Sequence, residues 1–150
     1  MIDSDDWSVL HTINMIEGAG RDWSGGDFCP PRMGIGDISR GDTVGRSFGG
    51  QWDHHGHQNG LEVDIRYVRT DTLEGALNIV SDSMHYYRIA TGMLINFLLR
   101  NCIGEAIIAS PYCHLVFEDV DVVYDESGVH DNHFHLRIVD PDSTWNRTLN

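Results

Sequence analysis

The chain has 150 residues, enough for one domain with one hydrophobic core. Its formal net charge of -13 argues against the basic surface that nucleic-acid binding needs, so no nucleic-acid partner is expected. The best apolar run, Met93 to Leu99, is far shorter than the roughly 20 residues that cross a bilayer, so no membrane span is expected. The sequence predicts one domain over residues 1–150 and leaves its oligomeric state open.

The N-terminus is acidic and polar, without the basic and apolar regions of a signal peptide, so none is expected. The three cysteines, Cys29, Cys102 and Cys113, lack the CxxC spacing of structural zinc sites. One disulfide, with Cys102 and Cys113 as the nearer pair, and three free thiols both stay open.

In chain order, apolar periodicity first predicts a short helix over residues 5–17. Residues 18–50 are rich in glycine and predict loops, with one short strand near residues 35–38. A histidine-rich turn follows at residues 53–60. Residues 61–68 then alternate and predict a half-buried strand. Its apolar side comprises Leu61, Val63, Ile65 and Tyr67, and its polar side Glu62, Asp64 and Arg66.

The second half of the chain predicts a short helix over residues 73–82 and the main helix over residues 86–101. The apolar stripe of the main helix comprises Ile89, Met93, Leu94, Phe97 and Leu98. Residues 105–110 and 115–117 suggest short strands. Residues 120–124 are ambiguous, and residues 133–139 alternate as a strand.

Histidines fall in two clusters that both touch predicted strands. The first comprises His54, His55 and His57, and the second His130, His133 and His135. Because side chains alternate along a strand, His133 and His135 share one face with Arg137, opposite an apolar face. Residues two apart lie roughly 6.5 Å apart along a strand. One histidine can therefore bind a metal while the other reaches a water on that metal.

Asp64 points to the polar side of its strand, and His57 precedes the turn that leads into it. The turn can bring His57 and Asp64 to one point, and His135 completes a set of two histidines and one carboxylate. Three protein ligands with one open position are typical of catalytic zinc, although another divalent ion would fit this set nearly as well.

These residues carry a family resemblance. Residues 57–65 (HQNGLEVDI) resemble the H-Q-x-G-x-x-V-D motif of the penicillin-insensitive murein endopeptidases, and residues 133–135 (HFH) resemble their HxH motif. Residues 35–39 (IGDIS) resemble a segment that precedes the first ligand. The family belongs with lysostaphin-type peptidases, D-alanyl-D-alanine metallopeptidases and the hedgehog signalling domain. The fold implied is α+β, a small antiparallel sheet with helices packed on one side.

The resemblance implies one zinc ion per chain, with His57, Asp64 and His135 as ligands. It implies His133 as the general base and His54 as a residue that stabilises the tetrahedral intermediate. The implied reaction is hydrolysis of a peptide amide in peptidoglycan, which implies a periplasmic or extracellular location at the cell wall.

Several alternatives remain at this point. The chain could be a D,D-dipeptidase or carboxypeptidase, or a zinc-binding recognition module of the hedgehog type without activity. Glu62 shares a face with Asp64 and could either support the metal site or be an ordinary strand residue. Arg137 could bind a substrate carboxylate or form a salt bridge, and the salt bridge is the commoner case. Asp131 is expected to shape the loop before the last strand, with His130 a weaker candidate for the site.

Overall fold

The computed structural model describes residues 10–25, 30–38, 60–101, 103–113 and 122–139. This part of the chain forms two α-helices, four strands and three short 3-10 helices. They are α1 (Leu10–Gly25), β1 (Glu62–Arg66), η2 (Ser83–His85), α2 (Arg88–Arg100), β2 (Gly104–Ala109), η3 (Pro111–Cys113), β3 (Val122–Tyr124), η4 (Val129–Asp131) and β4 (His133–Ile138).

The four strands form one sheet in the order β1-β4-β2-β3. β4 pairs antiparallel with both β1 and β2, whereas β3 pairs parallel with β2. The predicted α+β class is therefore confirmed, but the sheet is mixed and not purely antiparallel. The difference arises at residues 120–124, whose pattern was ambiguous. A parallel neighbour needs a crossover connection, which the chain between β2 and β3 supplies.

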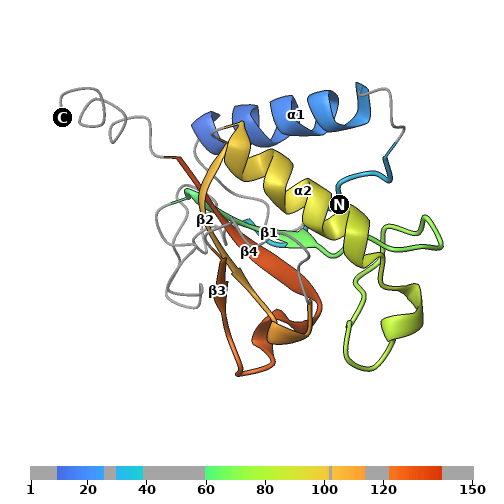
Figure 1. Cartoon of the computed structure of the whole chain (residues 1–150). Helices are drawn as coiled ribbons and strands as arrows, with labels where there is room; N and C mark the ends of the chain where they lie inside the picture. Colours follow the sequence, from blue (N-terminus) through green and yellow to red (C-terminus); the bar gives the residue numbers. More distant parts are fainter. Residues whose placement is uncertain (1–9, 26–29, 39–59, 102, 114–121, 140–150) are drawn as a thin grey trace, which may run out of the picture.

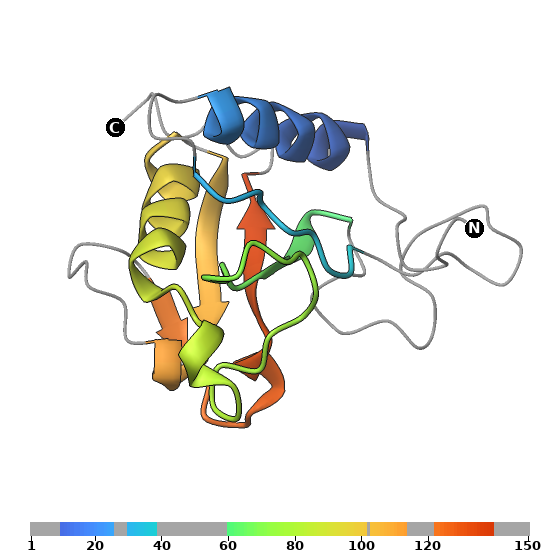
Figure 2. The ribbon, with the colours of Figure 1, turned by 90° about the vertical axis from the view of Figure 1, so that its right-hand side faces the viewer.

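Both described helices cover the same side of the sheet (Figure 1). In Figure 2, α2 runs along β2, and α1 lies across the end of the sheet where β4 finishes. The hydrophobic core lies between the helices and the sheet. The apolar side of β4 contributes Phe134, Leu136 and Ile138 to it, and all three are fully buried. Within the described ranges, neither helix is both long and apolar enough to pass through a membrane.

The first helix is longer than its sequence pattern predicts. It runs to Gly25, eight residues past the predicted end at Glu17 and through the glycine-rich start of the expected loop region. Ile16, Ala19 and Trp23 are buried at helical spacing, so packing on one face outweighs the low helix propensity of glycine. The Trp23 indole also donates a hydrogen bond to the Pro31 carbonyl at 2.7 Å.

The main helix begins two residues later than predicted and ends one residue earlier, at Arg88 and Arg100. Its buried side is rotated from the predicted stripe. Ile89 is exposed, and Thr91 is fully buried. The Thr91 hydroxyl accepts a hydrogen bond from the Val68 backbone N–H at 3.0 Å, which joins α2 to the segment that follows β1.

Two other predicted elements differ from the structure. Residues 73–82 do not form a helix, because Leu77 and Ile79 are buried with a period of two and the Asn78 side chain accepts hydrogen bonds from the next turn. The predicted strand at residues 35–38 is reduced to a single bridge at Ile35. Residues 115–117 lie outside the described residues, as do Cys29 and Cys102, so the choice between a Cys102–Cys113 disulfide and free thiols stays open. Cys113 itself is buried.

The free edge of β1 is covered by residues 34–37. Gly36 donates its backbone N–H to the Asp64 carbonyl at 2.7 Å, and Asp64 donates its own to the Asp37 carbonyl at 2.8 Å. Arg66 donates to the Gly34 carbonyl at 2.9 Å. β1 is thus flanked on both edges, by β4 and by this segment, and the backbone N–H and carbonyl of Asp64 both bond to residues 36 and 37.

Candidate metal centre

The predicted site residues of β1 and β4 face each other across an antiparallel pair. Asp64 is the register partner of His135, and Arg66 that of His133. The Asp64 Oδ1 atom lies 2.9 Å from His135 Nδ1 and 3.5 Å from His133 Nε2. Residues 71 positions apart in sequence are therefore brought together by strand pairing.

The polar face of the β1–β4 pair is more deeply buried than the exposed face of a half-buried strand would be. Asp64 is 7% exposed, His135 8% and Glu62 only 3%. On the opposite face the core residues of the same strands are fully buried. The prediction of one solvated face is therefore wrong for β1. Polar groups buried in this way need partners, and these side chains supply them to one another.

The imidazole of His135 lies between two carboxylates. Its Nδ1 faces Asp64, and its Nε2 lies 2.8 Å from Glu62 Oε2. Burial disfavours the charged ring, but the hydrogen bonds and charges of the two carboxylates outweigh it and raise the pKa of His135 to about 9. Burial also acts to raise the pKa of Glu62, yet His135 and Arg137 together lower it below its usual value.

His133 lies beside this pair and is oriented by its neighbour. The Asn132 amide oxygen lies 2.6 Å from His133 Nδ1. Because that oxygen only accepts, Nδ1 of a neutral His133 carries the proton and Nε2 keeps a lone pair. The lone pair is on the nitrogen that faces Asp64, so His133 can accept a proton within the site.

His130 completes the histidine cluster. Its ring centroid lies 5.1 Å from that of His133 and 6.2 Å from that of His135. Asp125 binds its Nδ1 at 2.7 Å. The Tyr67 hydroxyl donates to the His130 carbonyl at 2.9 Å, which fixes η4 against the end of β1. The sequence pattern made His130 a weaker candidate for the site. It could not predict the contact of His130 with Asp125, because no strand or motif marks Asp125.

Asp131 has the loop-shaping role that its position suggested. Its Oδ1 atom accepts a hydrogen bond from the Ser110 hydroxyl at 2.6 Å, and its carbonyl accepts one from the Ile79 backbone at 2.8 Å. The Ser110 backbone N–H donates in turn to the Tyr67 hydroxyl at 3.1 Å. The turn that carries His130 is thereby tied to the end of β2.

Glu62 and Arg137 form the part of the site that sequence reasoning left undecided. Arg137 donates to Glu62 Oε1 from Nε at 2.9 Å and from Nη2 at 2.7 Å. Alternation placed both residues on the polar face, but only the register shows that they are direct partners across the pair. The commoner reading of Arg137 as a salt-bridge residue is thus confirmed.

Two of the three predicted metal ligands, Asp64 and His135, lie together in this cluster. The third, His57, and the predicted catalytic His54 lie outside the described residues. Among the residues that are described, no three histidine, cysteine or acidic side chains form a group able to hold a metal ion. A complete site here therefore requires at least one ligand from elsewhere in the chain.

The donors that are described suit zinc. Two ligands of a tetrahedral zinc ion at 2.0–2.1 Å lie about 3.3 Å from each other. Asp64 Oδ1 and His135 Nδ1, the two predicted ligands that are described, lie 2.9 Å apart, within a few tenths of an ångström of that value. Imidazole and carboxylate are also the ligand types of catalytic zinc. The residues present fit the metal that the sequence predicts.

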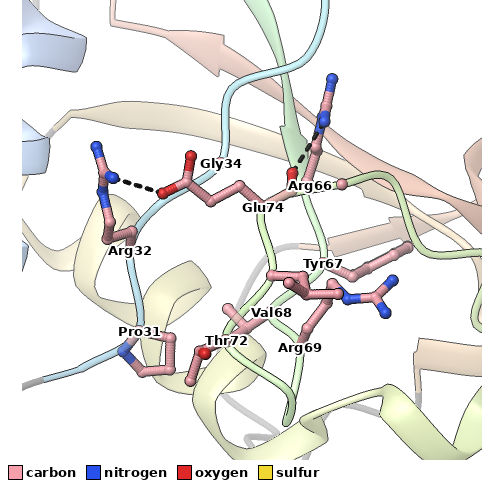
Figure 3. A pocket seen from close by; sticks show the side chains of 11 residues that line it. Pro31, Arg32, Gly34, Arg66, Tyr67, Val68, Arg69, Thr72 and Glu74 are labelled. Carbon is pink, nitrogen blue, oxygen red and sulfur yellow. Dashed lines mark hydrogen bonds and ion pairs between the residues drawn. The ribbon is translucent and has the colours of Figure 1, made fainter.

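A shallow pocket opens beside the end of β1 (Figure 3). Three segments of the chain line it, and they contribute residues 66–69, residues 72–75, and Pro31, Arg32 and Gly34. Two arginines bind Glu74. Arg32 forms an ion pair with the Glu74 carboxylate at 2.6 Å, and Arg66 donates a hydrogen bond to the Glu74 backbone carbonyl at 2.9 Å. Arg66, which lines the pocket, is the register partner of His133 on β4.

Comparison with models of known families and with curated proteins found no match for this chain.

Proposed function

We propose that this chain is a zinc-dependent peptidase that hydrolyses a peptide amide bond in peptidoglycan. The observation that carries the proposal is the convergence of Asp64, His133 and His135 on one enclosed face of two paired strands. In this arrangement the proposed metal ligands Asp64 and His135 and the proposed proton acceptor His133 can act on the same peptide amide. The motif resemblance supplies the substrate class.

In this proposal His57, Asp64 and His135 hold the metal. The chemistry that zinc supplies when bound is Lewis acidity, which lowers the pKa of a water to about 7 and polarises an amide carbonyl. Asp64 is kept in place by two backbone hydrogen bonds to residues 36 and 37, and its strand pairs with β4 on the other edge. His135 is kept in place by carboxylates on both of its nitrogens. Rigid support of this kind is what a reactive site needs.

His133 is the proposed general base. Its Nε2 accepts the proton of the attacking water and returns it to the amine that leaves. Nδ1 keeps its proton throughout and donates it in a hydrogen bond to the Asn132 amide oxygen, which keeps Nε2 directed at the site. His54 is proposed to stabilise the developing oxyanion, on the resemblance alone.

The hedgehog-like form of the α+β fold and a working place at the cell wall are part of the same proposal. A mixed sheet with both described helices on one side is compatible with that fold.

The first test is digestion of purified peptidoglycan by the zinc-loaded protein, with released fragments identified by mass spectrometry. Loss of cross-linked muropeptides that depends on zinc and disappears in His135→Ala is the expected result. It would also identify the bond that is cleaved. If the protein holds one zinc ion per chain and releases nothing, murein is not its substrate, and dipeptides or a binding role become the alternatives.

The role of His133 is tested by His133→Ala. We expect kcat to fall by about 10²–10⁴-fold with zinc still bound, because a general base contributes that much. His85→Ala is the matched control, since His85 also binds an acidic side chain but belongs to η2, away from β4. Undiminished turnover in a folded, zinc-loaded His133→Ala protein would remove His133 from the mechanism.

A further inference from the structure

Glu62 has a distinct partner on each carboxylate oxygen. Oε2 lies 2.8 Å from His135 Nε2, and Oε1 accepts both hydrogen bonds of Arg137. The Glu62 side chain is 4% exposed, whereas that of Arg137 is 49% exposed. The carboxylate therefore joins a partly solvated guanidinium to a buried imidazole across the β1–β4 pair.

A buried carboxylate is costly unless charged hydrogen-bond donors compensate it. Glu62 has such donors on both sides, and neither Arg137 nor His135 is its neighbour in sequence. An ordinary strand glutamate would turn its carboxylate towards water. The position of this carboxylate is better explained by the group that it contacts, which is a predicted metal ligand.

The two contacts of His135 have different consequences. A carboxylate only accepts, so the bond to Glu62 keeps a proton on Nε2 of the ring. Asp64 also only accepts, so without a metal Nδ1 carries a proton as well. A metal that binds Nδ1 replaces that proton, while the proton on Nε2 stays in its hydrogen bond to Glu62. Glu62 thereby sets both the orientation of the ring and the nitrogen that is offered to a metal.

We propose that Glu62, held by Arg137, is a positioning residue that orients His135 for metal binding. The inference rests on the proposed function, in which Asp64 and His135 are ligands. Carboxylates that bind the second nitrogen of a ligand histidine commonly strengthen metal affinity in this way. Arg137 fixes the carboxylate, so the guanidinium acts through Glu62 and not on the metal or substrate.

The test measures the zinc dissociation constant of the full chain by competition with a chromophoric chelator. We expect Glu62→Gln to weaken zinc binding about 10–100-fold, the usual effect of losing such a partner. Glu74→Gln is the matched control, because Glu74 also pairs with an arginine but belongs to the segment after β1 and not to the β1–β4 pair. The visible spectrum of the cobalt-substituted protein should shift in Glu62→Gln and not in Glu74→Gln.

Arg137→Met provides a second variant, since its side chain is half exposed and its loss should leave the fold intact. It should weaken zinc binding in the same direction as Glu62→Gln. Zinc affinity and cobalt spectra that are unchanged in the folded variants would overturn the positioning role. Failure of the proposed function is distinguishable, because wild-type protein would then bind no zinc or would bind it equally well after His135→Ala.

Discussion

At the scale of single residues, the position of Asp64 depends on a neighbour without a side chain. A Cβ atom at Gly36 would lie 3.2 Å from Asp64 Cβ and 3.3 Å from the Asp64 carbonyl oxygen. The Gly36 backbone also donates a hydrogen bond to that same oxygen. The close approach of residues 34–37 to β1 therefore requires glycine at this position.

We expect Gly36→Ala to lower the free energy of unfolding by about 1–3 kcal/mol, because the added methyl group must displace the segment from β1. Urea denaturation of the metal-free protein measures this effect. Gly75→Ala is the matched control, since its Cβ would meet nothing within 4 Å. Equal stabilities for the two variants would show that the segment moves away from β1 at no cost.

At the scale of elements, β4 is the strand on which fold and site meet. It is central in the sheet, and its two faces carry different kinds of residue. Phe134, Leu136 and Ile138 are in the core, while His133 and His135 face Asp64. Alternate residues of β4 therefore serve the core and the candidate site. Substitutions on the core face should lower the stability, and a substitution of His133 should chiefly affect the site.

Leu136→Ala should lower the free energy of unfolding by about 2–5 kcal/mol, as buried leucine truncations do. Leu136 is fully buried and lies against Gly104 of β2, so a cavity would open between adjacent strands. His133→Ala should cost clearly less, because its side chain is partly exposed and is not in the core. Thermal and urea unfolding of both variants compare them; a larger loss for His133→Ala would contradict this division of β4.

At the scale of the whole molecule, the pairing of β1 with β4 brings together Asp64 and His135, two of the three predicted metal ligands. A metal that these residues bind only in the folded chain must stabilise the folded state. The excess of acidic residues, with a net charge of -13, should also be partly offset by a bound cation.

Free zinc at 100 times its dissociation constant should therefore raise the free energy of unfolding by about 2.7 kcal/mol. Chelation of the metal should reverse the gain. Denaturation at several zinc concentrations gives the measurement, with His135→Ala as the variant that loses the increment. An equal increment in His135→Ala would place the metal elsewhere on the chain.

Local patterns were sufficient for much of this molecule. Strict alternation predicted β1 and β4, with Asp64, His133 and His135 on their polar faces, and apolar periodicity predicted α2 within two residues of each end. These patterns succeed because a strand or helix with one apolar face has one way to bury it. They also selected the candidate ligands His57, Asp64 and His135, whose binding of a metal stays a prediction.

Long-range packing decided the rest. The sequence left Glu62 open between two roles, because only the β1–β4 register brings it against His135 and Arg137. The sequence also did not predict the extension of α1, where the burial of Trp23 outweighs the low helix propensity of the glycines. Nor did it predict the parallel pairing of β3 with β2. Propensity and periodicity describe neighbours along the chain. Contacts between residues some 70 positions apart arise only when the sheet has formed and its register is set.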